Sequence, residues 1–180
     1  MLARMVRPAL ASAALAMAVV GIAGWHHIRV RQFIQSAYDL LREELPEAFR
    51  KHDVELRTSM LQLRFHDENA VYQLRVRHKA RLLEIGTEFR GTRDENVRWR
   101  DRLAEGLSEL KARIGPLIEL EETSKTRTRL FENIRLDPDQ TQPISRSLTD
   151  AQALETAKRF ARFIQAVEPL ARGVRTGEHR

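Results

Sequence analysis

Two glutamates, Glu84 and Glu88, are the residues of this sequence whose type and spacing most readily suggest chemistry. They lie in the segment LLEIGTEF (82–89), where apolar residues alternate with polar residues or glycine. On a β-strand this alternation places both carboxylates on one face, about 13 Å apart along the chain. Glycosidases hold their two carboxyl groups roughly 5 to 10 Å apart. The pair therefore does not fit glycoside hydrolysis.

Other catalytic patterns are also missing from the sequence. A metal-dependent nuclease would need an acid followed, on the next strand, by acid-x-Lys. Neither glutamate has a lysine two positions later, because Gly86 and Arg90 stand there. The sequence also lacks a G-x-S-x-G serine motif, a phosphate-binding P-loop and a G-x-G-x-x-G motif. These absences argue against the common hydrolase and nucleotide-binding classes.

Arginines accompany the two glutamates on the predicted strands. Arg64, Arg75 and Arg77 alternate with apolar residues, so they share the polar face of the sheet. Arg75 falls opposite Glu84 across a hairpin, and such pairs contribute about 0.2–1 kcal/mol. We expect a solvated or helix-covered polar face, with Glu84 as an exposed or half-exposed partner of Arg75 and Glu88 dispensable. The alternative is that these five residues form a ligand-binding face.

A second basic group lies in the segment KTRTR (125–129). Lys125, Arg127 and Arg129 alternate with threonines, which places the three positive charges on one side of a strand. This side could meet phosphate, lipid headgroups or an acidic protein. As an edge strand protected by charge, the segment would need no function at all.

Metal and thiol chemistry have little support in the sequence. The chain contains no cysteine, which excludes disulfides, thiol nucleophiles and cysteine ligands. His66, Asp67 and Glu68 are adjacent in a predicted turn, with His78 one hairpin away, but adjacent turn residues rarely converge on one metal. We therefore predict no catalytic residue, no metal site and no cofactor.

The N-terminal part carries an uncharged run of 18 residues, 8–25, that is rich in alanine. This is the lower limit of what crosses a bilayer as a helix. Arg4 and Arg7 precede the run and Arg29 and Arg31 follow it, so the charge rule does not set an orientation.

Three interpretations of residues 8–25 remain open. They form a single-pass membrane anchor, a cleaved signal peptide, or an extension from a start codon assigned too far upstream, which would leave a cytoplasmic protein. The anchor is favoured because no proline separates Ala9 from Leu45, so a helix could run from the membrane into the rest of the chain. The expected organisation is a membrane or signal segment (1–27), one domain (28–171) and a flexible tail (172–180).

The net charge of +6 invites a nucleic-acid interpretation, but its distribution does not favour one. The first 31 residues hold four arginines and no acidic residue, which leaves 27 basic and 25 acidic side chains for the rest. A duplex-binding domain concentrates basic residues on one face. Nucleic acid is therefore a possible partner but not the favoured one.

The elements that must position these residues follow from the apolar periodicity. Helical spacing predicts a helix over 28–49 that Pro46 bends or ends. Alternation then predicts three strands over 61–65, 72–76 and 83–89, joined by turns at 66–69 and 78–80. A second helix begins at Thr92 or Asp94 and ends at Gly115.

The C-terminal third repeats the change from strand to helix. Two strands are expected within 117–122 and 126–136, followed by a loop at 137–143. Ser147 and Thr149 then offer two overlapping capping boxes for a last helix. Its predicted core stripe is Leu154, Ala157, Phe160, Ala161, Ile164 and Val167.

This order predicts an α+β fold, with a five-stranded, mostly antiparallel sheet and helices packed on one face. The first three strands should bury their apolar face against the second helix. The expected contacts join Leu74, Val76, Leu83, Ile85 and Phe89 to Leu103, Leu107 and Leu110.

The middle of the chain, about residues 60–170, resembles a group of uncharacterised bacterial α+β domains. The matching residues are Leu83, Glu84, Ile85, Gly86, Glu95, Asn96 and Gly115. Some of these domains occur at the C-terminal end of predicted restriction-like nucleases. The resemblance implies the α+β layout and assigns no catalytic residue.

The sequence therefore favours a non-enzymatic, membrane-tethered α+β domain that binds a protein or a small ligand. The alternative is a cytosolic accessory domain for nucleic-acid metabolism, with a spurious N-terminal extension.

Overall fold

The computed structural model of the chain describes residues 29–65, 69–136 and 144–175. Within that part, no helix has the length and apolar character needed to cross a bilayer. The predicted membrane segment at 8–25 lies outside the described residues. So do most of the predicted turn at 66–69, the loop at 137–143 and the end of the tail.

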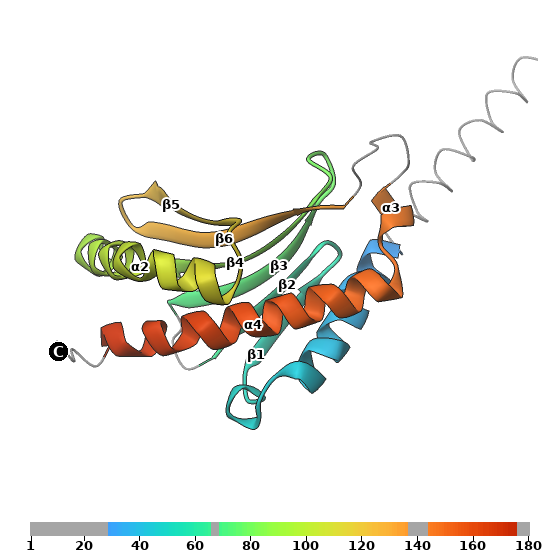
Figure 1. Cartoon of the computed structure of the whole chain (residues 1–180), viewed down its shortest axis with the longest axis horizontal. Helices are drawn as coiled ribbons and strands as arrows, with labels where there is room; N and C mark the ends of the chain where they lie inside the picture. The colour runs from blue at the N-terminus through green and yellow to red at the C-terminus, as the bar shows by residue number, and fades with distance from the viewer. Residues whose placement is uncertain (1–28, 66–68, 137–143, 176–180) are drawn as a thin grey trace, which may run out of the picture.

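The described strands form a single antiparallel sheet in the order β1-β2-β3-β4-β6-β5 (Figure 1). An antiparallel α+β fold is thus confirmed, but the sheet has six strands where the sequence predicted five. The additional strand is β1, which pairs with β2 through a two-residue turn. The strands are β1 (Asp53–Arg57), β2 (Met60–Arg64), β3 (Ala70–Arg77), β4 (Leu82–Arg90), β5 (Ile118–Ser124) and β6 (Arg127–Arg135).

The described helices lie on one face of this sheet, as predicted (Figure 1). Residues 29–44 form the first helix, which ends before Pro46 and is followed by the 3-10 turn η1 (Glu47–Phe49). The long helices α2 (Arg93–Arg113) and α4 (Asp150–Arg175) pack against each other; α2 also packs against β4, β5 and β6, and α4 against β3 and β4. The short helix α3 (Ile144–Ser147) precedes α4.

The caps explain where the two long helices begin and end. Thr92, not Asp94, caps α2 and forms a reciprocal capping box with Glu95. The helix ends before Gly115, whose φ of +154° suits a glycine. For α4 the cap is Thr149, whose Oγ1 accepts a hydrogen bond from the backbone N–H of Gln152 at 3.2 Å.

The apolar core lies between the helices and the sheet, largely as predicted. Leu74, Val76, Leu83, Ile85, Phe89, Leu103 and Leu110 are buried, and Phe89 stacks on Trp99 with 4.3 Å between ring centroids. Leu107 is only partly buried. Leu154 was expected in the core and is exposed, because the buried stripe of α4 begins at Ala153, about 100° around the helix from Leu154.

Two buried glutamates connect α4 to the sheet. Tyr72 donates a hydrogen bond to Glu168 at 2.7 Å, and Arg172 approaches the same carboxylate at 3.2 Å. On β6, Glu132 accepts a hydrogen bond from Arg159 of α4 at 3.1 Å. Burial raises the pKa of Glu132, although the charge of Arg159 opposes this shift. These contacts fix α4 to strands β3 and β6. The opposite face of the sheet carries no described helix.

Candidate functional site

The sheet face without helices, here called the open face, has a buried carboxylate at its centre. Register places Glu84 of β4 between Arg75 of β3 and Asn133 of β6. Glu84 is only 2% exposed, although no described helix covers it. Burial at this position must therefore come from side chains of the neighbouring strands.

Three arginines surround the Glu84 carboxylate. The Nη2 atom of Arg129 lies 2.5 Å from Oε1, and the Nη1 atom of Arg77 lies 3.1 Å from Oε2. The Nη1 atom of Arg75 is farther away, at 4.0 Å from Oε1. These three arginines and Glu84 are here called the Glu84 cluster. Arg129 also lies 3.7 Å from Glu121 of β5, between Nη1 and Oε2, so the cluster together with Glu121 has a net charge of +1.

Gly86 makes room for the side chain of Arg129, which reaches Glu84 from a position farther along the sheet. Arg129 is paired in register with Glu88, four residues along β4 from Glu84, so its side chain must extend along the sheet. It crosses the ring of Phe131, with 4.8 Å between Cζ and the ring centroid. Phe131 pairs with Gly86, where a Cβ atom would lie 2.7 Å from the Cβ of Phe131. A glycine at 86 thus permits the close approach that supports Arg129.

These contacts correct the expectation for Glu84. The pairing with Arg75 is present, at 4.0 Å, but the expectation that Glu84 is exposed or half-exposed is wrong, because Glu84 is buried and two other arginines lie closer to it. Arg75 instead donates a hydrogen bond to the side-chain oxygen of Gln73 at 2.9 Å. The second predicted basic group, Lys125, Arg127 and Arg129, is not held together. Arg129 belongs to the Glu84 cluster, whereas Lys125 lies exposed in the β5–β6 turn.

The remaining predicted residues lie on the open face but away from its centre. Glu88 is held by its neighbour Arg90, with 2.6 Å between Nε and Oε1. Arg127 pairs in register with Arg90, and Arg64 pairs with Asp53 on the edge strand β1. The structure therefore brings Arg75, Arg77, Glu84 and Arg129 together, and leaves Arg64, Glu88, Lys125 and Arg127 outside the cluster.

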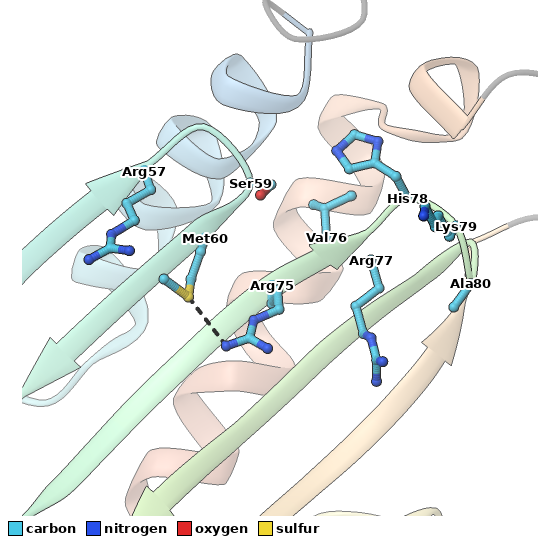
Figure 2. A pocket seen from close by; sticks show the side chains of 9 residues that line it. All are labelled: Arg57, Ser59, Met60, Arg75, Val76, Arg77, His78, Lys79 and Ala80. Atoms are coloured by element: carbon cyan, nitrogen blue, oxygen red, sulfur yellow. Dashed lines mark hydrogen bonds between the residues drawn. The ribbon is translucent and has the colours of Figure 1, made fainter.

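A hollow of about 520 Å³ lies beside the Glu84 cluster, where the β1–β2 and β3–β4 turns meet (Figure 2). Arg75 and Arg77 belong to both the cluster and this hollow, here called the arginine pocket. Figure 2 shows Arg57 of β1 on the same side of the sheet as these two arginines. The lining residues are Arg57, Ser59, Met60, Arg75, Val76, Arg77, His78, Lys79 and Ala80.

The chemistry of the arginine pocket is that of an anion site. Its lining offers guanidinium groups and an ammonium group, and no acidic side chain is among the nine lining residues. Nearby, Gln73 is buried, and its Nε2 donor has no hydrogen-bond partner among the described residues. An unpaired buried donor beside an excess of positive charge suits a ligand that supplies acceptor oxygens.

Metal binding has no comparable support in the described part of the chain. No group of three or more histidines and acidic residues is placed there to hold a metal ion. His66, Asp67 and Glu68 lie outside the described residues, and His78 is exposed at the arginine pocket.

Sequence reasoning missed Arg57, Ser59, Met60 and Lys79. The first three belong to the β1–β2 hairpin, which was not predicted because its first strand is short and holds only two apolar residues. The alternation in DVELR (53–57) followed by Thr58-Ser59 was the available signal.

Comparison with known proteins does not add to this geometry. No protein-family model matches the chain, and no curated protein or solved structure matches it either. The resemblance to bacterial α+β domains therefore stays a prediction.

Proposed function

We propose that this chain is a non-enzymatic binding module whose arginine pocket holds an anionic group of a protein or a small ligand. The chemical class is a phosphate or a carboxylate, since both accept paired hydrogen bonds from guanidinium groups. The single observation that carries the proposal is the excess of arginine around a buried carboxylate, next to a hollow without acidic lining.

Glu84 supports this proposal as a fixed anchor for the arginines. A guanidinium has five N–H donors, so an arginine that binds Glu84 keeps donors for a ligand. Arg75 and Arg77 keep 38% and 47% of their side-chain surface exposed, while the glutamate beneath them is almost fully covered. Arginines fixed in this way lose less conformational entropy when an anion binds.

The same contacts favour binding over catalysis. Both oxygens of Glu84 already accept hydrogen bonds, Oε1 from Arg129 and Oε2 from Arg77. A general base must have an oxygen within reach of the proton that it removes. A carboxylate enclosed by two guanidinium groups is poorly placed for that role.

We further propose that residues 8–25 tether this module to a membrane as a single-pass segment. The support is the sequence alone: an uncharged run of 18 residues flanked by arginines. The alternative, a cytosolic accessory domain for nucleic-acid metabolism, is less favoured, because Asp53, Glu55, Glu119 and Glu121 border the open face and interrupt its positive charge.

The anion proposal is tested by titrating the full-length protein with inorganic phosphate at constant ionic strength and following its thermal midpoint. A ligand that binds only the folded state raises the midpoint as its concentration rises. We expect this rise in the wild type and its loss in Arg77→Gln. Arg113→Gln is the matched control, since Arg113 is an exposed arginine at the end of α2 whose only ion pair among described residues joins it to Glu109.

Two results would contradict the proposal. One is a wild-type midpoint that phosphate does not move more than chloride of equal ionic strength. The other is an equal response of Arg77→Gln and Arg113→Gln, which would show that phosphate acts on the protein without using the arginine pocket.

A further inference from the structure

The edge strand β1 exposes both its backbone and its apolar side chains. It is the outermost strand beside β2, so one of its long edges is unpaired within the described sheet. Val54 and Leu56 point to the helix side of the sheet but are 44% and 40% exposed. An open edge with exposed apolar residues is a template for pairing with another strand.

The β1–β2 turn determines which backbone groups are free. Thr58 and Ser59 form a two-residue turn, so Arg57 and Met60 close it as a hydrogen-bonded pair. Along an antiparallel pair, hydrogen-bonded and non-bonded positions alternate. The N–H and C=O groups of Val54 and Leu56 therefore point away from β2, toward the open edge.

The opposite edge of the sheet is protected in ways that β1 is not. Strand β5 carries three glutamates and has an irregular register between Glu122 and Ser124. Bulges and a run of like charges are common devices against edge pairing. In β1, by contrast, the open face carries Asp53, Glu55 and Arg57, and the neighbouring opposite charges of Glu55 and Arg57 can complement those of a second copy.

We propose that β1 pairs antiparallel with β1 of a second copy of this chain, with Glu55 opposite Arg57 of the partner copy. In this register Leu56 lies opposite its own counterpart on the two-fold axis. Glu55 and Arg57 already form an ion pair within one copy, with 2.6 Å between Nη2 and Oε1. The pairing joins the two apolar strips and places each of these side chains beside its opposite charge in the other copy, which gives two Glu55–Arg57 contacts between copies. The neighbouring register, with Asp53 opposite Arg57, would place the two Glu55 carboxylates face to face, which is unfavourable.

Reversing the charge of Glu55 or of Arg57 tests this proposal. In full-length protein kept in mild detergent, two differently tagged forms are mixed and co-capture is measured. Wild-type copies should capture each other. Glu55→Arg alone and Arg57→Glu alone should each lose self-capture by roughly tenfold, because two attractive contacts become repulsive.

The decisive experiment mixes the two charge-reversed variants. Glu55→Arg paired with Arg57→Glu restores an opposite charge at both contacts, so their mutual capture should return toward the wild-type value. Leu56→Pro removes an outward N–H group without changing the β1–β2 hydrogen bonds, and it should abolish capture in every combination. Circular dichroism checks that each variant is folded, as expected for side chains at an exposed edge.

Several outcomes would overturn the proposal. Wild-type copies that do not capture each other would leave the β1 edge to a different partner. Single variants that self-associate like the wild type would place the contact elsewhere, for example in residues 8–25. A mixture that fails to recover would rule out the Glu55–Arg57 register.

Arg57 also lines the arginine pocket, so Arg57→Glu changes both sites, and a different variant must separate the two proposals. Arg77→Gln, which tests the arginine pocket, leaves β1 unchanged and should associate like the wild type. Loss of phosphate binding and loss of association are thus separate results, each bearing on its own proposal.

Discussion

At the scale of single residues, Glu84 shows how a charge becomes buried on a sheet face that no described helix covers. Its neighbours are long arginines, and Arg129 comes from a strand 45 residues further along the chain. Removing one member of a buried charge group is costly, because the others are left without a partner. The arginines are partly exposed, so water reduces this penalty.

The variant Glu84→Gln should therefore lower the free energy of unfolding by about 1–3 kcal/mol. Glu88→Gln is the matched control. Its carboxylate pairs with the half-exposed Arg90, so we expect a loss below about 1 kcal/mol. Chemical denaturation of both variants beside the wild type measures the difference. Equal losses would show that the three arginines do not depend on Glu84.

The position of Glu84 was predictable from the sequence, but its burial was not. Period-two alternation placed it beside Arg75, and the structure confirms that register. The contact with Arg129 depends on the order of the strands, which puts β6 next to β4. Local periodicity contains no information on which distant strand becomes the neighbour, so the most important contact of the cluster could not be found from the sequence.

At the scale of elements, α2 shows how burial varies along one apolar stripe. Leu103 and Leu110 are fully buried, while Leu107 lies between them in sequence and is only partly buried. The stripe recurs every three to four residues, so small rotations along a helix move a position from the core toward its rim.

We expect Leu103→Ala to lower the free energy of unfolding by about 2–5 kcal/mol, as in other fully buried leucines. Leu107→Ala should cost clearly less, about 1–2 kcal/mol, since part of its side chain is already in water. Denaturant unfolding of the two variants gives the comparison. A larger loss for Leu107→Ala would mean that α2 is rotated relative to the sheet.

Elements with strong periodicity were predicted well, and those with weak periodicity were not. Strands β3 and β4 and helix α2 combine long apolar patterns with clear turn or cap signals, and all three are present. Strand β1 has two apolar residues, both exposed, so it is held by backbone pairing with β2 and not by burial. A strand of this kind has only a weak pattern of apolar residues in the sequence. The pocket residues of the β1–β2 hairpin, Arg57, Ser59 and Met60, were therefore not predicted either.

At the scale of the whole molecule, the charge distribution separates two kinds of contact. The first 31 residues hold four arginines without an acidic residue, and the rest of the chain is nearly balanced. A membrane could thus hold the protein through the apolar run at 8–25 or through positive charge alone. The two attachments differ in their response to salt, because salt screens surface charge and leaves apolar burial in place.

The last prediction uses that difference. As a helix, residues 8–25 would extend about 27 Å, close to the apolar thickness of a bilayer. The full-length protein should therefore stay in the membrane pellet after a high-salt wash, and a variant lacking residues 8–25 should move to the supernatant. Arg77→Gln should remain in the pellet, since its charge lies in the arginine pocket.

Intact mass of the pelleted protein separates the remaining interpretations: an anchor keeps residues 8–25, whereas a cleaved signal or a later start codon removes them. Release of the full-length chain by salt would show attachment through charge and would overturn the anchor.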